Sequence, residues 1–234
     1  MMKRTLALVL ALMLLMCSAA LADEVITVSG TATVQLEPDM VMITLGVSAT
    51  DKEVLAAQQQ VNTAMNQVIA ALKDEMGIPA EDIATTEYRI HEQYEYSSLS
   101  GRSEKTGFNA VAMLSICVRN LDQAGAVIDA AMKAGANQLA GVEFMSSDQR
   151  DARDQALTLA VQDGMRKAKV IAAAAGVELP MLPSSITEAS MATYAASNST
   201  YMMMDAAATT EASTTLQAGM LSVTAKVTIT YEID

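Results

Sequence analysis

The fold of this chain is decided by residues 25–48, VITVSGTATVQLEPDMVMITLGVS. Apolar residues alternate with polar ones before and after Glu37-Pro38-Asp39. Alternation with a period of two is typical of a β-strand with one buried and one exposed face, and Pro followed by Asp favours a turn. The segment therefore predicts a β-hairpin with one apolar face that the rest of the chain must cover.

Three helices and five further strands are predicted after this hairpin. The helices are indicated by apolar or Ala residues that recur at three- and four-residue steps, and each run ends at a glycine. They cover residues 54–76, 121–132 and 146–176. The strands are indicated by period-two alternation. They cover residues 85–96, 107–118, 138–146, 182–188 and 222–233.

The resulting order of elements is ββαββαβαββ. Strand pairs interleaved with single helices favour an α+β fold, here a two-layer α/β sandwich in which helices cover a largely antiparallel sheet. We expect two intertwined subdomains, of which the middle one, about residues 84–188, is ferredoxin-like. The C-terminal strand is predicted to lie beside the N-terminal hairpin.

Residues 1–22 have the three parts of a secretory signal peptide. Lys3 and Arg4 precede an apolar run over residues 6–16, and Ala20-Leu21-Ala22 is a cleavage signal. The run is shorter than the roughly 20 residues that span a bilayer. We therefore expect an exported mature chain of residues 23–234, located in the periplasm or outside the cell, with no transmembrane segment after cleavage. An uncleaved anchor and a lipid-modified Cys17 are the alternatives.

The charge of the chain argues against two classes of partner. The net charge of −12 becomes −14 when Lys3 and Arg4 are removed with the signal peptide. Phosphate backbones and anionic membrane surfaces repel a protein of this charge. Nucleic acid is therefore excluded as an expected partner.

Residues 189–217 interrupt the regular patterns. They are rich in Ala, Ser and Thr, have no clean period, and contain Tyr201 followed by Met202-Met203-Met204. We predict a mobile arm between two strands. Thioethers select Cu(I) and are readily oxidised to the sulfoxide, so the three methionines are candidate soft-metal ligands or oxidant scavengers. Alternatively, they cover a neighbouring surface, because Met is an adaptable filler at contacts.

Residues for catalysis are scarce. The only histidine, His91, falls on the polar face of its predicted strand. Without Cys17, Cys117 is the sole cysteine, so a His/Cys zinc site lacks ligands, although a disulfide between chains remains open. No nucleotide-binding glycine motif is present. We therefore predict a protein with no catalytic residues and no cofactor, and a hydrolase would require carboxylates that converge in a cleft.

Five features, in this order along the chain, resemble the SIMPL-domain family of bacterial envelope proteins. They are Val28-Ser29-Gly30; Pro38-Asp39; Gly77-Ile78 with Asp82-Ile83 and Thr85; Ala156, Ala160, Lys167, Ala168 and Gly176 of an Ala-rich helix; and Gly219 before Val223, Ala225, Val227, Ile229 and Tyr231. The resemblance covers essentially the whole mature chain. It departs in the Met-bearing Ala/Ser/Thr arm and at Gly164, where the family helix usually has Ala, and Gly within a helix costs about 1 kcal/mol relative to Ala.

The resemblance implies an exported, non-enzymatic protein without a catalytic motif. Members include periplasmic immunogenic proteins, are associated with oxidative-stress defence, and can form large ring or channel-like oligomers. Because aromatic residues concentrate at interfaces, Tyr88, Tyr94, Tyr96 and Tyr201 are the candidate contact residues. The predicted function is binding and self-assembly as a homo-oligomer. The alternative is Cu(I) binding or redox buffering through Met202, Met203 and Met204.

Overall fold

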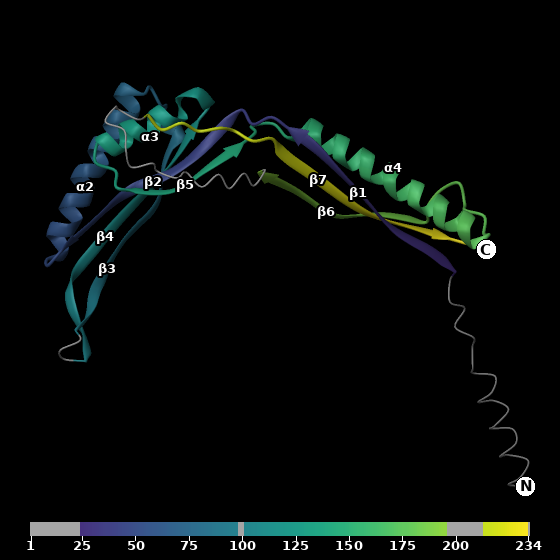
Figure 1. Cartoon of the computed structure of the whole chain (residues 1–234), viewed down its shortest axis with the longest axis horizontal. Coiled ribbons are helices and arrows are strands. Elements are labelled where there is room, and N and C mark those ends of the chain that lie inside the picture. Colours follow the sequence, from purple (N-terminus) through teal and green to yellow (C-terminus); the bar gives the residue numbers. More distant parts are fainter. Residues whose placement is uncertain (1–23, 98–100, 196–212, 234) are drawn as a thin grey trace, which may run out of the picture. The chain divides into compact units, whose positions relative to one another are not determined.

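The computed structural model describes residues 24–97, 101–195 and 213–233 (Figure 1). The helices and strands follow the predicted order ββαββαβαββ, and the predicted α+β class is confirmed. They are β1 (Val25–Leu36), β2 (Met40–Asp51), α2 (Val54–Ala70), β3 (Ile83–Ser97), β4 (Arg102–Val118), α3 (Ala124–Lys133), β5 (Gln138–Met145), α4 (Arg150–Ala175), β6 (Ser185–Ala195) and β7 (Leu221–Glu232).

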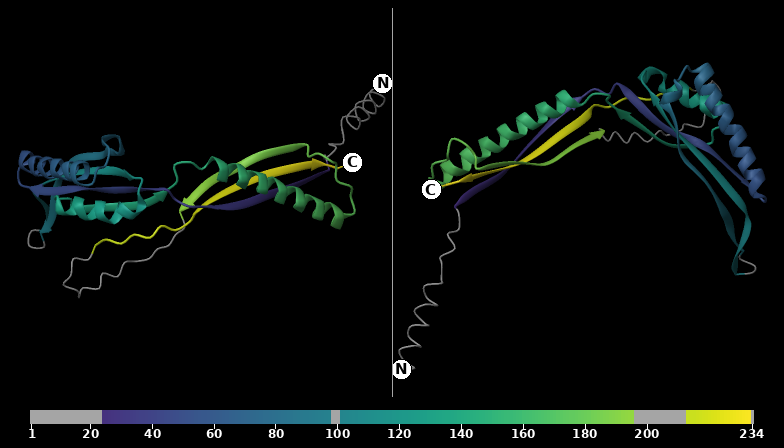
Figure 2. Two further views of the ribbon diagram at one scale, coloured as in Figure 1. Left: turned by 90° about the horizontal axis from the view of Figure 1, so that it is seen from above. Right: turned by 180° about the vertical axis from the view of Figure 1, so that it is seen from behind.

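Four strands form one antiparallel sheet in the order β3-β4-β2-β5. Helices α2 and α3 cover one face of this sheet (Figures 1 and 2). Alternate residues of β2 and β4, such as Ile43 and Leu114, are fully buried against Val61 of α2 and Val127 of α3. Burial of each such side chain contributes roughly 1.5–3 kcal/mol, which explains why the alternation of these strands is so regular.

The other three strands form a second sheet in the order β1-β7-β6. Helix α4 lies along it, and its small residues permit a close approach. A Cβ atom on Gly30 of β1 would come within 2.0 Å of the Ala160 carbonyl oxygen, and one on Gly164 would come within 2.7 Å of Ile229 Cδ1. Gly164 therefore has a packing reason that outweighs its low helix propensity.

The predicted N-terminal hairpin is wrong, because β1 and β2 belong to different sheets. Asp39 does not close a hairpin between β1 and β2 but is hydrogen-bonded to the end of β5. Its N–H donates to the Met145 carbonyl oxygen at 3.0 Å, and its carboxylate accepts from the Ser147 N–H at 2.8 Å. Alternation predicted both strands correctly but carries no information about which strand pairs with which.

The predicted place of the C-terminal strand beside β1 is confirmed. The hydroxyl groups of Thr27 and Thr230 lie 3.2 Å apart, and those of Thr33 and Thr224 lie 3.0 Å apart. Strand β7 thus occupies the position beside β1 that the hairpin prediction assigned to β2.

The described chain divides into two compact units, each built from separate segments, as the prediction of intertwined subdomains requires. One unit combines residues 24–32, 157–191 and 225–233, and the other takes its residues from 33–156 and 192–224. The boundaries of the ferredoxin-like subdomain, about residues 84–188, stay a prediction. No helix among the described residues is long and apolar enough to cross a bilayer.

Residues 189–195, the first part of the predicted arm of residues 189–217, belong to strand β6, which continues to Ala195. On its C-terminal side the chain is attached to α3: the Thr214 N–H donates to Asp129 Oδ2 at 3.0 Å, and its hydroxyl donates to Oδ1 at 2.6 Å. The predicted signal peptide, Tyr201 and the run Met202-Met203-Met204 lie outside the described residues.

Candidate functional site

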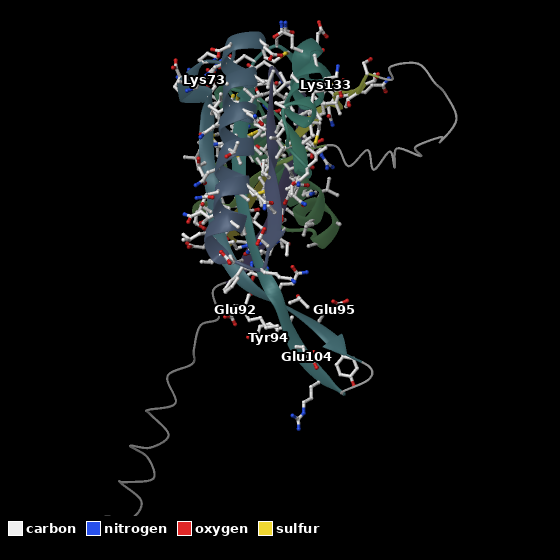
Figure 3. All side chains as sticks on the ribbon, turned by 90° about the vertical axis from the view of Figure 1, so that its left-hand side faces the viewer. Lys73, Glu92, Tyr94, Glu95, Glu104 and Lys133 are labelled. Atoms are coloured by element: carbon white, nitrogen blue, oxygen red, sulfur yellow. The ribbon has the colours of Figure 1, made fainter. Side chains whose placement is uncertain are left out.

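The β3–β4 hairpin extends beyond the rest of its sheet (Figures 1 and 3). The pairing of β4 with β2 ends at Phe108 and Asp51. Beyond that pair, the described residues of β3 and β4 are paired only with each other, from Gln93 opposite Gly107 to Ser97 opposite Arg102. We call residues 92–97 and 101–108 the distal ribbon.

The distal ribbon is open to solvent. The side chains of residues 92–96 and 101–106 are all exposed, and Phe108 at the base of the ribbon is half-buried. A two-stranded hairpin without a third strand or a covering helix is only marginally stable in water. The distal ribbon must therefore be held by contacts between its own two strands unless a partner covers it.

Those contacts centre on Lys105. Its ammonium group lies 2.6 Å from Glu92 Oε1 and 3.8 Å from the centroid of the Phe108 ring, which combines an ion pair with a cation–π contact. The Tyr94 hydroxyl donates to the second carboxylate oxygen of Glu92 at 2.5 Å. The cluster joins the two strands and holds the Tyr94 ring at a defined place on one face.

The electrostatics of this cluster follow from the same contacts. The hydrogen bonds from Lys105 and Tyr94 lower the pKa of Glu92, because both stabilise the carboxylate. The acceptor carboxylate raises the pKa of Tyr94, because it stabilises the protonated phenol and repels the phenolate. Glu92 is therefore ionised and Tyr94 neutral at physiological pH. Figure 3 shows both on the hairpin, with Glu95 and Glu104 farther toward its tip.

Three of the four predicted interface tyrosines lie on β3, and alternation places them on one face. Tyr88 is 46% exposed, and its hydroxyl donates to Asn62 Oδ1 of α2 at 3.0 Å. Tyr94 and Tyr96 are 56% and 68% exposed on the distal ribbon. The structure therefore brings Tyr94 and Tyr96 together as an exposed aromatic pair, whereas Tyr88 is engaged with the protein's own helix.

Lys105 and Phe108 were not among the residues singled out from the sequence. They join the cluster through register: Tyr94 lies opposite Lys105 and Glu92 lies opposite Phe108, with an irregularity between Gln93 and Tyr94. The irregularity displaces one strand by a residue, so alternation alone does not pair them. Pairing of the two predicted strands around the turn was the signal that pointed to this region.

Two other polar side chains are either exposed or paired within the protein. His91 is exposed on β3 opposite Asn109. The buried Asp82 accepts two hydrogen bonds from the Arg119 guanidinium, at 2.8 and 3.2 Å, and these bonds raise the pKa of Arg119. Within the described ranges, no group of three or more His, Cys, Asp or Glu side chains could hold a metal ion.

Comparison with known proteins gives one family and several relatives. Residues 26–231 match the model of the SIMPL family, described as a protein of unknown function (DUF541). The chain is similar to the uncharacterized protein YggE of Edwardsiella ictaluri, with 31% identity over 154 residues that cover 66% of this chain and 64% of that protein.

Two further relatives have similar coverage. YggE of Escherichia coli K12 is 28% identical over 159 residues, which are 66% of this chain and 63% of that protein. The 26 kDa periplasmic immunogenic protein of Brucella melitensis is 29% identical over 157 residues, which are 66% of this chain and 62% of that protein. These matches span just under two thirds of the length of the curated relatives.

Proposed function

The chain belongs to the SIMPL family, and from this premise we propose that it is an exported, non-enzymatic protein of the cell envelope that acts through binding and self-assembly. The signal-like residues 1–22 support export. The name of the Brucella relative supports the periplasm as the destination. The distal ribbon is the contact surface.

The single observation that carries this proposal is the exposed aromatic pair on an unsupported two-stranded ribbon. Tyr94 and Tyr96 are more than half exposed, and tyrosine is enriched at protein interfaces. A partner that covers these rings removes apolar area from water and supports a hairpin that is marginal alone. The marginal stability of the hairpin and its exposed tyrosines therefore both favour the binding of a partner at the distal ribbon.

A second copy of this chain is the partner that the ribbon fits. Strand β3 is at the edge of the four-stranded sheet, so its outer backbone groups can pair with another strand. The ribbon carries both Glu95 and Arg102, and mixed charges can meet their opposites in an antiparallel copy related by a two-fold axis. Homo-oligomerisation through β3 pairs the outer backbone groups of the strand and brings oppositely charged side chains together.

Two finer parts of the proposal rest on sulfur chemistry. The link to oxidative-stress defence is supported by the family resemblance and by 18 methionines in the chain, each a substrate for reversible oxidation. The alternative function, Cu(I) binding or redox buffering, is supported by the consecutive thioethers of Met202, Met203 and Met204. Mass spectrometry after mild peroxide treatment tests the oxidant role: these three should be oxidised before the buried Met65.

The experiment for self-assembly is light scattering on the mature chain over a range of concentrations. The wild type should have the mass of an oligomer, and the double variant Tyr94→Ala/Tyr96→Ala should shift to the monomer. Tyr194→Ala is the matched control, because Tyr194 is 61% exposed but lies on β6. A wild type that stays monomeric at high concentration, or a double variant that assembles like the control, contradicts the proposal.

A further inference from the structure

The face of the four-stranded sheet opposite α2 and α3 carries a group of sulfur atoms. Val41 and Ile43 of β2 are fully buried on the helix side, so Met40 and Met42, which alternate with them, point to the other face. Met42 lies directly opposite Cys117 of β4, and Met40 lies directly opposite Met145 of β5. Residues that face each other across paired strands share one side of the sheet.

Two of the sulfur atoms on this face are in contact. Cys117 Sγ lies 3.7 Å from Met40 Sδ. The Ser115 hydroxyl donates to Met42 Sδ at 2.7 Å, which places this thioether beside the same strand as Cys117. All four sulfur residues are half-buried, so the group is reached from solvent while being partly shielded from it. We call Met40, Met42, Cys117 and Met145 the sulfur cluster.

We propose that the sulfur cluster is a binding site for a soft monovalent metal ion of the Cu(I) class. Thiolate and thioether groups are the ligands that select Cu(I) over harder ions. Two sulfur ligands on one tetrahedral ion, with metal–sulfur bonds of about 2.3 Å, lie about 3.8 Å apart. The observed separation of 3.7 Å between Cys117 and Met40 fits two ligands of one ion.

The charges around the cluster suit a cation. Glu143 of β5 lies opposite Met42 on the same face and adds a carboxylate. The nearby cation, Arg119, is held by two hydrogen bonds to Asp82, so its charge is compensated. Binding replaces the Cys117 S–H proton by the metal ion, and this proton is released to solvent. No oxidant or reductant takes part, because the ion is bound in its reduced state.

This site differs from the run Met202-Met203-Met204 in ligands and in position along the chain. It contains a thiol, which can supply an anionic ligand, and it is built on three neighbouring strands whose spacing is set by backbone hydrogen bonds. Ligands on rigid strands lose little conformational freedom on binding. Two sets of variants can therefore separate the two candidates.

The test is a competition titration of the reduced mature chain with Cu(I) against a chromophoric chelator, without oxygen. The wild type should bind one ion at this site, and Cys117→Ser should lose at least about 100-fold in affinity. Met42→Leu should lose about 10-fold, because three ligands remain. Met181→Leu is the control, since Met181 is almost fully exposed and outside the cluster. The triple variant Met202→Leu/Met203→Leu/Met204→Leu should retain the affinity of this site.

A second measurement keeps the test independent of folding defects. Bound Cu(I) should protect Cys117 of the wild type from alkylation by iodoacetamide, and X-ray absorption should give copper–sulfur distances of about 2.3 Å. The proposal is overturned if Cys117→Ser binds as tightly as the wild type, if Cys117 is alkylated equally with and without Cu(I), or if only the triple variant loses affinity.

Discussion

At Gly30 the folded chain leaves no room for one methyl group, whereas at Tyr94 and Tyr96 it leaves two aromatic rings more than half exposed. Both sites lie on strands that the sequence marks by the same period-two alternation. At Gly30, helix α4 covers the buried face of the strand, and the backbones of the helix and the strand are close together. On the distal ribbon, the alternation of β3 and β4 continues beyond the end of β2, where no third strand of the described chain supports it.

The comparison separates two uses of a β-strand. Where a helix covers the face, each position is constrained by shape, and substitutions should act on stability. Where the face is open, no described helix packs over the exposed aromatic rings, so substitution of these rings should act on association. The predictions below test this separation, from the largest expected effect on stability to the smallest.

Gly30→Ala should have the largest effect. The new Cβ would lie 2.0 Å from the Ala160 carbonyl oxygen and 2.6 Å from the Gly164 nitrogen, and backbone atoms cannot move away as a side chain can. We expect a loss of about 3 kcal/mol or more in the free energy of unfolding, measured by urea denaturation. Gly141→Ala on β5 is the control, because no atom lies within 4 Å of its new Cβ. Equal losses would refute the packing argument.

Asp163→Asn should weaken the protein in a pH-dependent way. The Lys167 ammonium, the Thr31 N–H and Arg166 bind the Asp163 carboxylate and hold its pKa well below the ordinary value of 3.8. A carboxyl group with a lowered folded pKa stabilises the protein above its unfolded pKa, and this stabilisation is lost as the pH falls through the folded value.

The measurement for Asp163 is the urea midpoint between pH 7 and pH 2. Below about pH 4 the wild type should lose stability that Asp163→Asn already lacks, so the variant curve should be flatter. Glu92→Gln on the distal ribbon is the matched comparison, because the pKa of Glu92 is also lowered by its partners but its side chain is exposed. A larger flattening for Glu92→Gln than for Asp163→Asn would reverse the proposed order of the two regions.

Gly164→Ala should have a mixed effect. Alanine favours the helix by about 1 kcal/mol, but its Cβ would lie 2.7 Å from Ile229 Cδ1, the flexible end of a side chain. We expect a net loss of about 1 kcal/mol in the wild type. In an Ile229→Val background, which lacks that carbon, the same change should become stabilising. A double-mutant cycle measured by urea denaturation that shows simple additivity would contradict this.

Tyr94→Ala/Tyr96→Ala should have the smallest effect on stability. At concentrations where the chain is monomeric, its unfolding free energy should stay within about 0.5 kcal/mol of the wild type. The loss should instead appear in the mass measured by light scattering. A large loss of monomer stability would mean that these rings pack within the chain, and the ribbon would then belong with Gly30 as a region constrained by its own fold.

The sequence was a good guide to elements and a poor guide to their ends and contacts. Thr50 followed three residues later by Glu53 is the sequence pattern of a capping box at the start of the first helix. The structure instead has Glu53 at the N-cap without a side-chain bond, and the Asp51 carboxylate accepts from the Glu53 N–H. Strand β2 continues to Asp51, so pairing with β4 takes Thr50 away from the helix. Tertiary pairing therefore overrode a local capping preference.

The candidate sites show the same division. Composition singled out the tyrosines, and two of them lie on the distal ribbon. The partners Lys105 and Phe108 depended on an irregular register, and the sulfur cluster depended on which strands flank β2. Met42 and Cys117 are 75 positions apart in the chain but directly opposite each other in the sheet. No local pattern brings such residues together.

Local alternation and helical periodicity were enough to give the order ββαββαβαββ, because each strand or helix must turn its own apolar residues to one side. The choice of partners came only from the folded chain. Every strand offers the same backbone donors and acceptors, so β1 could have paired with β2 or with β7. The hydrogen bond between Asp39 and Ser147 forms where a turn was expected. Strand β1 pairs with β7, and α4 packs closely against it at Gly30.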